Sequence, residues 1–256
     1  MPWPRTSAGP AHSAPPAQIS LPAHHPADDV TTNLRISLTI LSVGFAIEGI
    51  GEAYSAVSHR SLLPSSSLLL VLPTAITFVG LLFVWIGRHE WNELHRTRVR
   101  NAHQVFGMSL LGGAFAGATA GALFVDPGLG FPDWAYLVFG LGVGVLVMGT
   151  FVTYAILVFH LIGNASRIVL AAALAWAFVV AAFLGATLAR ALPAIVALLR
   201  SPTTAAASLL GPVDVIESYL FVSYFLLLAV YLEAHRRVAR GLAAAAVGSE
   251  GTRRPS

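Results

Sequence analysis

Cysteine and lysine are both absent from this 256-residue chain, and each absence removes a class of chemistry. Without cysteine, there are no disulfides, no thiolate metal ligands, no cysteine nucleophile and no cysteine-ligated iron–sulfur cluster. Without lysine, no side chain forms a Schiff base with retinal or pyridoxal phosphate. The chain therefore relies on arginine, histidine, carboxyl and hydroxyl groups for any chemistry that it performs.

Charged residues are also scarce. They make up 11% of the chain, against about 25% in an average soluble domain, whereas apolar residues make up 56%. Six charge-poor stretches each have roughly the 20 residues that a bilayer core requires. We therefore expect an all-α integral membrane protein, a bundle of about six transmembrane helices. The predicted spans are Leu34–Val57, Ser67–Ile86, Gln104–Val125, Trp134–Ile162, Ile168–Arg190 and Val213–Leu232.

Composition divides the chain into three regions. Residues 1–32 are rich in proline and alanine and predict a disordered cytoplasmic tail, and residues 33–235 form the six-helix transmembrane domain. Residues 236–256 predict a basic cytoplasmic C-terminal tail. The segment Ala191–Leu199 is too short to cross a bilayer, and Pro193 suits a first helical turn. We expect it to form a short interfacial helix after the fifth span.

The arginines predict how the chain sits in the membrane. With both termini inside, twelve arginines fall on cytoplasmic segments and three, Arg60, Arg190 and Arg200, fall on outer segments. This positive-inside bias predicts a multi-pass protein of the cell membrane with both termini in the cytoplasm. The formal net charge of +3 does not indicate nucleic acid, because the arginines flank apolar spans and topology accounts for them.

Glycines at four-residue intervals mark the third and fourth spans. Such small faces let helix backbones approach closely, and the short turn between these spans makes the two helices neighbours. We favour packing within the chain, while a homo-oligomer or a partner in a membrane complex, docked through these faces, is the alternative. The bilayer itself is the expected lipid partner. The glycines are Gly113, Gly117, Gly121, Gly140 and Gly144.

Two carboxylates, Glu48 and Glu52, lie inside the first span. Placing an ionised acid in hydrocarbon costs several kcal/mol or more unless the acid is neutralised or paired, so intramembrane acids are candidates for function. If the first span enters the bilayer from the cytoplasm at Leu34 and rises 1.5 Å per residue, Glu48 lies ~21 Å and Glu52 ~27 Å into a hydrocarbon core of ~30 Å. Glu217 and Asp214 of the sixth span come to a similar depth, and Arg190 is the basic group expected beside them.

Three interpretations of these acids stay open. Glu48 binds a proton or a cation, because a partly buried carboxyl group exchanges protons near neutral pH. Alternatively, Glu48, Glu52 and Glu217 coordinate a divalent cation through hard oxygen ligands. In the third interpretation, the acids pair with Arg190 and neighbouring hydroxyl groups and only hold the bundle together.

Histidines give a weaker indication of a metal or haem. His89 and Glu93 are four residues apart in the second cytoplasmic segment, with His103 nearby, but this spacing is not the zinc-protease motif. His160 comes to the depth of His103, and two facing histidines are the ligands of a b-type haem. We expect no cofactor, and the interpretation as a haem-carrying redox subunit ranks last.

The best-supported function from sequence is a protein that binds or moves a proton or cation at an intramembrane glutamate. A non-enzymatic structural or assembly subunit is the alternative. No span carries a nucleophile elbow, a phosphate-binding loop or a dinucleotide fingerprint, so an enzyme is the less favoured expectation.

Overall fold

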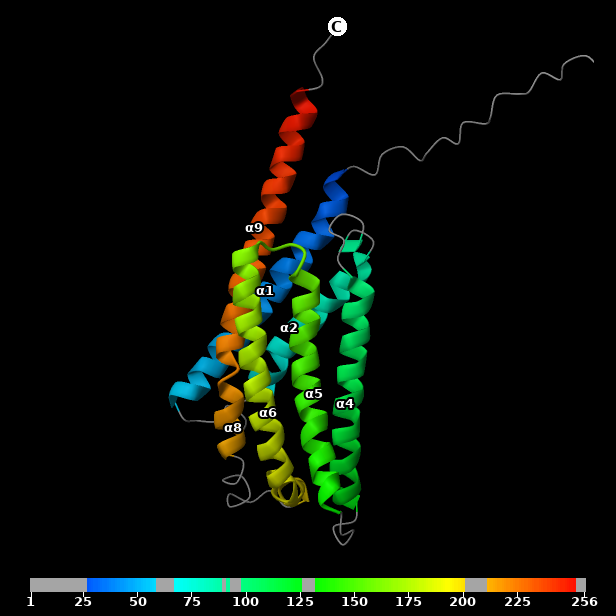
Figure 1. The fold of residues 1–256 in the computed structure, drawn as a ribbon, viewed down its shortest axis with the longest axis vertical. Helices are drawn as coiled ribbons and strands as arrows, with labels where there is room; N and C mark the ends of the chain where they lie inside the picture. Colours follow the sequence, from blue (N-terminus) through cyan, green and yellow to red (C-terminus); the bar gives the residue numbers. More distant parts are fainter. Residues whose placement is uncertain are drawn as a thin grey trace, which may run out of the picture.

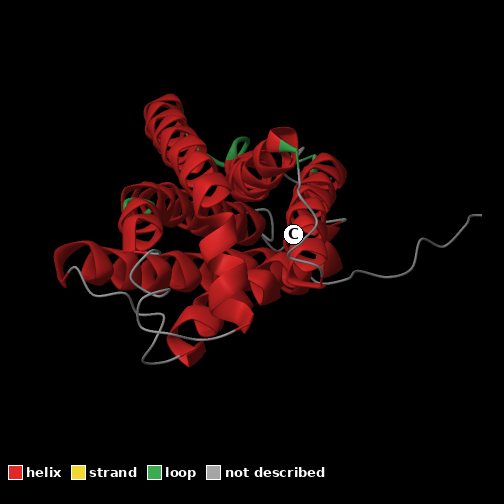
Figure 2. Cartoon of the chain, turned by 90° about the horizontal axis from the view of Figure 1, so that it is seen from below, coloured by secondary structure: helices red, strands yellow, loops and turns green. Residues whose placement is uncertain are grey.

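The computed structural model describes residues 27–58, 67–88, 91–92, 98–125, 132–200 and 211–251. Within these residues every regular element is helical, and Figure 2 shows helices with a few short loops and no strand in the described part of the chain. The elements are α1 (Ala27–Ser58), α2 (Ser67–Ile86), α4 (Val99–Val125), α5 (Asp133–Val158), α6 (Asn164–Arg200), α8 (Gly211–Ser218) and α9 (Phe221–Gly251).

The protein is a multi-pass membrane protein with an all-α bundle, as the sequence predicts. Five helical stretches in the described part of the chain are long and apolar enough to cross a bilayer. The helix α2 adds a 20-residue apolar segment. Because α1 and α4 both begin at the same end of the molecule, the chain returns through α2 between them (Figure 1). The five stretches are Asn33–Val57, Val99–Val125, Asp133–Val158, Asn164–Val196 and Val215–Arg240.

The helices are arranged in two groups that meet at α6 and α9. The helices α4, α5 and α6 are antiparallel neighbours in chain order, and α9 packs against both α6 and α1. Figure 1 shows α1 crossing the bundle diagonally, while α4, α5, α6 and α9 run close to its long axis. The helix α2 packs against α1. The first span is therefore held between α2 on one side and α9 on the other.

Three helix ends differ from the expectation. The helix α1 begins at Ala27, inside the tail predicted over residues 1–32, and residues 1–26 lie outside the described part. The helix α9 continues to Gly251, so most of the C-terminal tail predicted over residues 236–256 is helical. Residues Ala191–Leu199 form the last turns of α6 rather than a separate helix, with Pro193 inside it.

Aromatic and aliphatic side chains fill the core between α1, α5, α6 and α9. Phe45 and Tyr231 are fully buried there, and Leu157 and Leu227 pack around them. A second, smaller cluster between α4, α5 and α6 includes Phe139. The larger cluster lies directly beside the acidic residues of α1, so these acids border the best-packed part of the protein.

Candidate functional site

Three of the predicted acids lie within electrostatic range of one tyrosine hydroxyl. Glu48 and Glu52 lie on α1 and Glu217 on α8, and each of the three side chains is half-buried. All three carboxyl groups act electrostatically on the hydroxyl of Tyr224, which lies on α9. Since α1 and α8 are far apart in the sequence, packing of α1 against α8 and α9 brings these acids together.

Hydroxyl groups surround the acids. The hydroxyl of Tyr154, on α5, lies near both Glu48 and Tyr224, and its side chain is hydrogen-bonded to that of Thr77 on α2. The hydroxyl of Tyr231 donates a hydrogen bond of 2.9 Å to the backbone carbonyl of Tyr154. We name the residues Glu48, Glu52, Glu217, Tyr224, Tyr154 and Thr77 the acid–tyrosine cluster. The sequence analysis missed these tyrosines, although hydroxyl groups inside apolar spans could have identified them.

A stack of aromatic rings forms one wall of the cluster. Phe45 lies three residues before Glu48 on α1, and its ring meets those of Tyr154 at 4.8 Å and Tyr231 at 5.0 Å, both edge to face. It also stacks on Tyr224 with 6.4 Å between centroids. Edge-to-face and offset contacts of this kind are the arrangements that aromatic pairs favour. The hydroxyl groups of the tyrosines are the polar groups that these rings present to the acids.

Two glycines let the neighbouring helices approach α1 where it carries the acids. A Cβ atom on Gly44 would overlap the methyl group of Thr77 on α2. A Cβ atom on Gly49 would lie 3.1–3.3 Å from three ring carbons of Phe225 on α9. Glu48 lies between these glycines in the sequence, so Thr77 of α2 and the ring of Phe225 of α9 both approach α1 close to it. This close approach keeps the carboxyl group beside protein rather than hydrocarbon.

The sixth span is interrupted beside the cluster. We expected one helix over Val213–Leu232, but α8 ends at Ser218 and α9 begins at Phe221. The amide of Leu220 donates to the Glu217 carbonyl at 2.9 Å, an i−3 bond that tightens the chain into a turn. Broken helices inside membranes require other partners for the freed backbone groups, and they are typical of binding sites.

An indole from α6 satisfies the backbone at this interruption. The Nε1 of Trp176 donates a hydrogen bond of 2.8 Å to the carbonyl of Tyr219. Nearby, the hydroxyl of Ser223 donates to the carbonyl of Ala173 on α6 at 2.9 Å. Tertiary contacts therefore hold this turn in place. The turn fixes the position of Glu217.

The structure puts the predicted basic partner elsewhere. Arg190 is exposed near the far end of α6, where it lines a pocket with Asp133 and Tyr136 of α5. It lies fourteen residues, or ~21 Å, along α6 from Trp176, which marks the level of the helix break. Arg190 is thus separated from the acids that it was expected to join. The side chain of Asp214 lies outside the described residues.

The histidine candidates that the structure describes, His103 and His160, have different neighbours. The Nδ1 of His103 donates a hydrogen bond of 2.9 Å to the carbonyl of Val99, and its ring packs against Trp85. His160 is exposed and packs against Phe159. His89 and Glu93 lie outside the described residues. Among the residues that the structure describes, no three histidine or carboxyl side chains converge closely enough to hold a metal ion. This arrangement weakens the divalent-cation interpretation of Glu48, Glu52 and Glu217.

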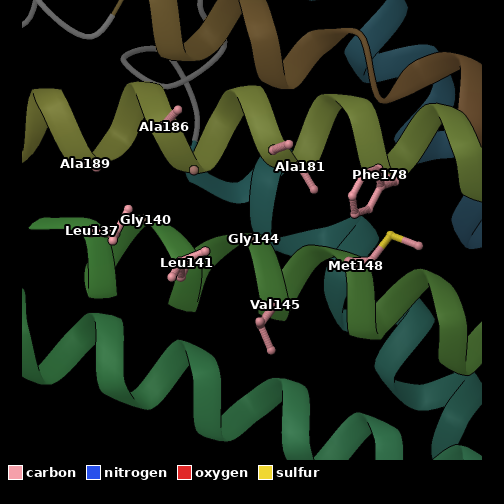
Figure 3. A pocket seen from close by; sticks show the side chains of 12 residues that line it. Leu137, Gly140, Leu141, Gly144, Val145, Met148, Phe178, Ala181, Ala186 and Ala189 are labelled. Atoms are coloured by element: carbon pink, nitrogen blue, oxygen red, sulfur yellow. The ribbon is translucent and has the colours of Figure 1, made fainter. Parts of the chain in front are cut away.

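A separate groove lies between α5 and α6, and Figure 3 shows the side chains that line it. Its cavity volume is about 390 Å³, and glycine, alanine and larger apolar residues form all of its wall. Gly140 and Gly185 touch through their backbones at its floor. Because the groove offers no charged or hydroxyl side chain, it does not suit an ion, and the acid–tyrosine cluster is the better candidate site.

No family model, curated protein or solved structure matches this chain, so the site is interpreted from its own geometry.

Proposed function

We propose that this protein binds or translocates a proton or a monovalent cation at Glu48, within the acid–tyrosine cluster. One observation carries the proposal: Glu48 and Glu52 of α1 and Glu217 of α8 all lie within electrostatic range of the hydroxyl of Tyr224 inside a membrane bundle. The arginine bias supports an orientation with both termini in the cytoplasm of a cell, as proposed from sequence.

The electrostatics of the cluster favour such a ligand. Ionised carboxyl groups that lie close together repel one another, and low dielectric strengthens this repulsion. A proton or a small cation bound at Glu48 lowers the negative charge of the cluster, which favours such a ligand. The hydroxyl groups of Tyr224 and Tyr154 each both donate and accept hydrogen bonds, so they provide a route by which a proton reaches or leaves Glu48.

Flux through liposomes tests the proposal. Purified protein is reconstituted, a potassium gradient with valinomycin sets the membrane potential, and an enclosed dye reports internal pH. We expect proton uptake by the wild type and none above empty liposomes for Glu48→Gln, which keeps size and hydrogen bonding but loses the charge. Glu233→Gln is the matched control, because Glu233 forms an ion pair with Arg237 on α9, away from the cluster.

Two results would contradict the proposal. The transport proposal would be contradicted if liposomes with the wild type acidified no faster than empty ones and also took up sodium and potassium no faster. Equal flux in the wild type and Glu48→Gln would show that this carboxyl group is not the site. A Glu233→Gln variant with unchanged flux, beside an inactive but folded Glu48→Gln variant, would support the assignment.

The alternative proposal, a structural or assembly subunit, is favoured by one feature of α4. A Cβ atom added to Gly117 or Gly121 would meet nothing within 4 Å, and Phe115 beside them is 66% exposed. Such a small-residue face is suited to docking another helix. If this is the function, Gly117→Leu disrupts an assembly seen by cross-linking in native membranes. Glu48→Gln then leaves that assembly intact.

A further inference from the structure

A second groove, between α1 and α9, combines charge with apolar surface. At the end of the molecule where α1 begins, Arg35, Thr39 and His235 line a hollow of about 330 Å³. A further hollow of about 310 Å³ continues from it, and Thr39 and His235 line both. The two hollows therefore form one continuous groove, which we name the α1–α9 groove.

The mouth of the groove is basic. Arg35 is exposed and His235 is half-buried, and both side chains line the same hollow. The nearby carboxyl group of Glu233 accepts a hydrogen bond of 2.6 Å from Arg237 on the same helix, so it is directed to that partner. A guanidinium group matches the geometry of phosphate oxygens. The mouth is therefore complementary to an anionic head group.

The deeper part of the groove is apolar and has the length of one leaflet. Val43 and Ala46 of α1 face Leu228 and Leu232 of α9 along it. Eleven residues separate Arg35 from Ala46, a distance of ~16 Å along the helix. This is close to half of the ~30 Å hydrocarbon core. Since α1 crosses the bundle diagonally, the groove runs obliquely from the end of the molecule where α1 begins toward the middle of the bilayer.

From these observations we infer that the α1–α9 groove binds a phospholipid with an anionic head group. The phosphate lies at Arg35 and His235, and one acyl chain lies against Val43, Ala46 and Leu232. Basic pockets between transmembrane helices are a recurrent way in which proteins hold such lipids. This inference concerns binding alone and stands independently of ion flux at Glu48.

Native mass spectrometry tests the inference with two defined lipids, phosphatidylglycerol and phosphatidylcholine with the same acyl chains. The wild type is expected to retain phosphatidylglycerol preferentially. Because one cation near a membrane surface changes binding by about fivefold, Arg35→Gln is expected to lower this preference by about that factor. Arg100→Gln is the matched control, since Arg100 is also exposed at this end but lies on α4.

A groove-filling variant examines the acyl-chain part separately. Ala46→Phe is expected to lower retention of phosphatidylglycerol, whereas Ala118→Phe, at an exposed position of α4, leaves retention unchanged. Equal loss of preference in Arg35→Gln and Arg100→Gln would overturn the inference, because general surface charge would then explain binding. Lipid-free dimers in the wild type would also overturn it and would assign the groove to a second copy. If Ala46→Phe fails to fold, the two arginine variants still decide the outcome.

Discussion

The contact between Gly140 of α5 and Gly185 of α6 predicts a large effect for a single methyl group. A Cβ atom on Gly185 would lie 2.5 Å from the carbonyl oxygen of Gly140, whereas ordinary van der Waals contact begins at 3.4 Å. The difference between these two distances is about 0.9 Å, so the two helices must separate by about that much to accept alanine. Inserting atoms into a packed interface of this kind costs about 1–3 kcal/mol.

The neighbouring Gly144 provides a control on the same interface. A Cβ atom there would lie 3.5 Å from the carbonyl oxygen of Ala181, an ordinary contact. Both Gly185→Ala and Gly144→Ala gain about 0.8–1.0 kcal/mol of helix propensity. The difference between the two variants therefore isolates the overpacking, and we expect Gly185→Ala to be the less stable by about 1–3 kcal/mol.

Thermal unfolding in detergent micelles, followed by tryptophan fluorescence, measures this difference. For a chain of this size, each kcal/mol shifts Tm by about 2–4 °C, so Gly185→Ala is expected at least about 2 °C below Gly144→Ala. Equal Tm values for the two variants, or a higher value for Gly185→Ala, would refute the reasoning. The backbones would then separate at no cost, and the close approach would not contribute to stability.

Two further predictions concern single hydrogen bonds. Tyr231→Phe removes the buried hydrogen bond of 2.9 Å to the Tyr154 carbonyl. Because the acceptor is left without this donor, the free energy of unfolding is expected to fall by about 1–3 kcal/mol. Unfolding in detergent measures this change. Trp176→Phe removes the 2.8 Å bond to the Tyr219 carbonyl at the helix break. Amide hydrogen exchange is expected to quicken around residue 219 and not in α4, whereas unchanged exchange would show that the turn is stable without the indole.

Hydrophobic patterning was sufficient to predict the membrane helices. Long apolar runs bounded by arginines leave few alternatives, because a bilayer core satisfies backbone groups only in helices or closed barrels. The short turn after Val125 also predicted that α4 and α5 are neighbours, which is confirmed. The glycines expected to pack there were wrong in part: Gly112 and Gly142 make the close contact between α4 and α5, whereas Gly140 and Gly144 face α6. Local sequence properties thus accounted for the elements and for the adjacency of consecutive helices.

The helix break beside Glu217 could not be predicted in the same way. Neither glycine nor proline occurs at Tyr219 or Leu220, so the local sequence favours a continuous helix. The turn depends on the hydrogen bond from Trp176, which lies 43 residues earlier. Conversely, Pro193 suggested a new helix start, yet α6 continues through it. In both places tertiary packing decides the outcome against local preference.

The candidate site shows the same division between local and tertiary information. Glu48 and Glu52 could be identified as intramembrane acids from α1 alone, because their cost in hydrocarbon is independent of the fold. Their neighbours could not, since depth along a helix does not give its rotation or tilt. Figure 1 shows that α1 crosses the bundle diagonally, which brings its acids to α9 and away from Arg190.

The glycines of α1 explain why that helix can carry acids within the bilayer. A charged group at the centre of a membrane helix costs about 2.5–3.5 kcal/mol even on the most permissive scales, so it requires protein around it. Gly44 admits Thr77 of α2 and Gly49 admits Phe225 of α9, one on each side of Glu48. Larger side chains at these positions would hold both neighbours away and leave the carboxyl group facing lipid. Close packing around Glu48 is therefore a condition for a carboxyl group at this position.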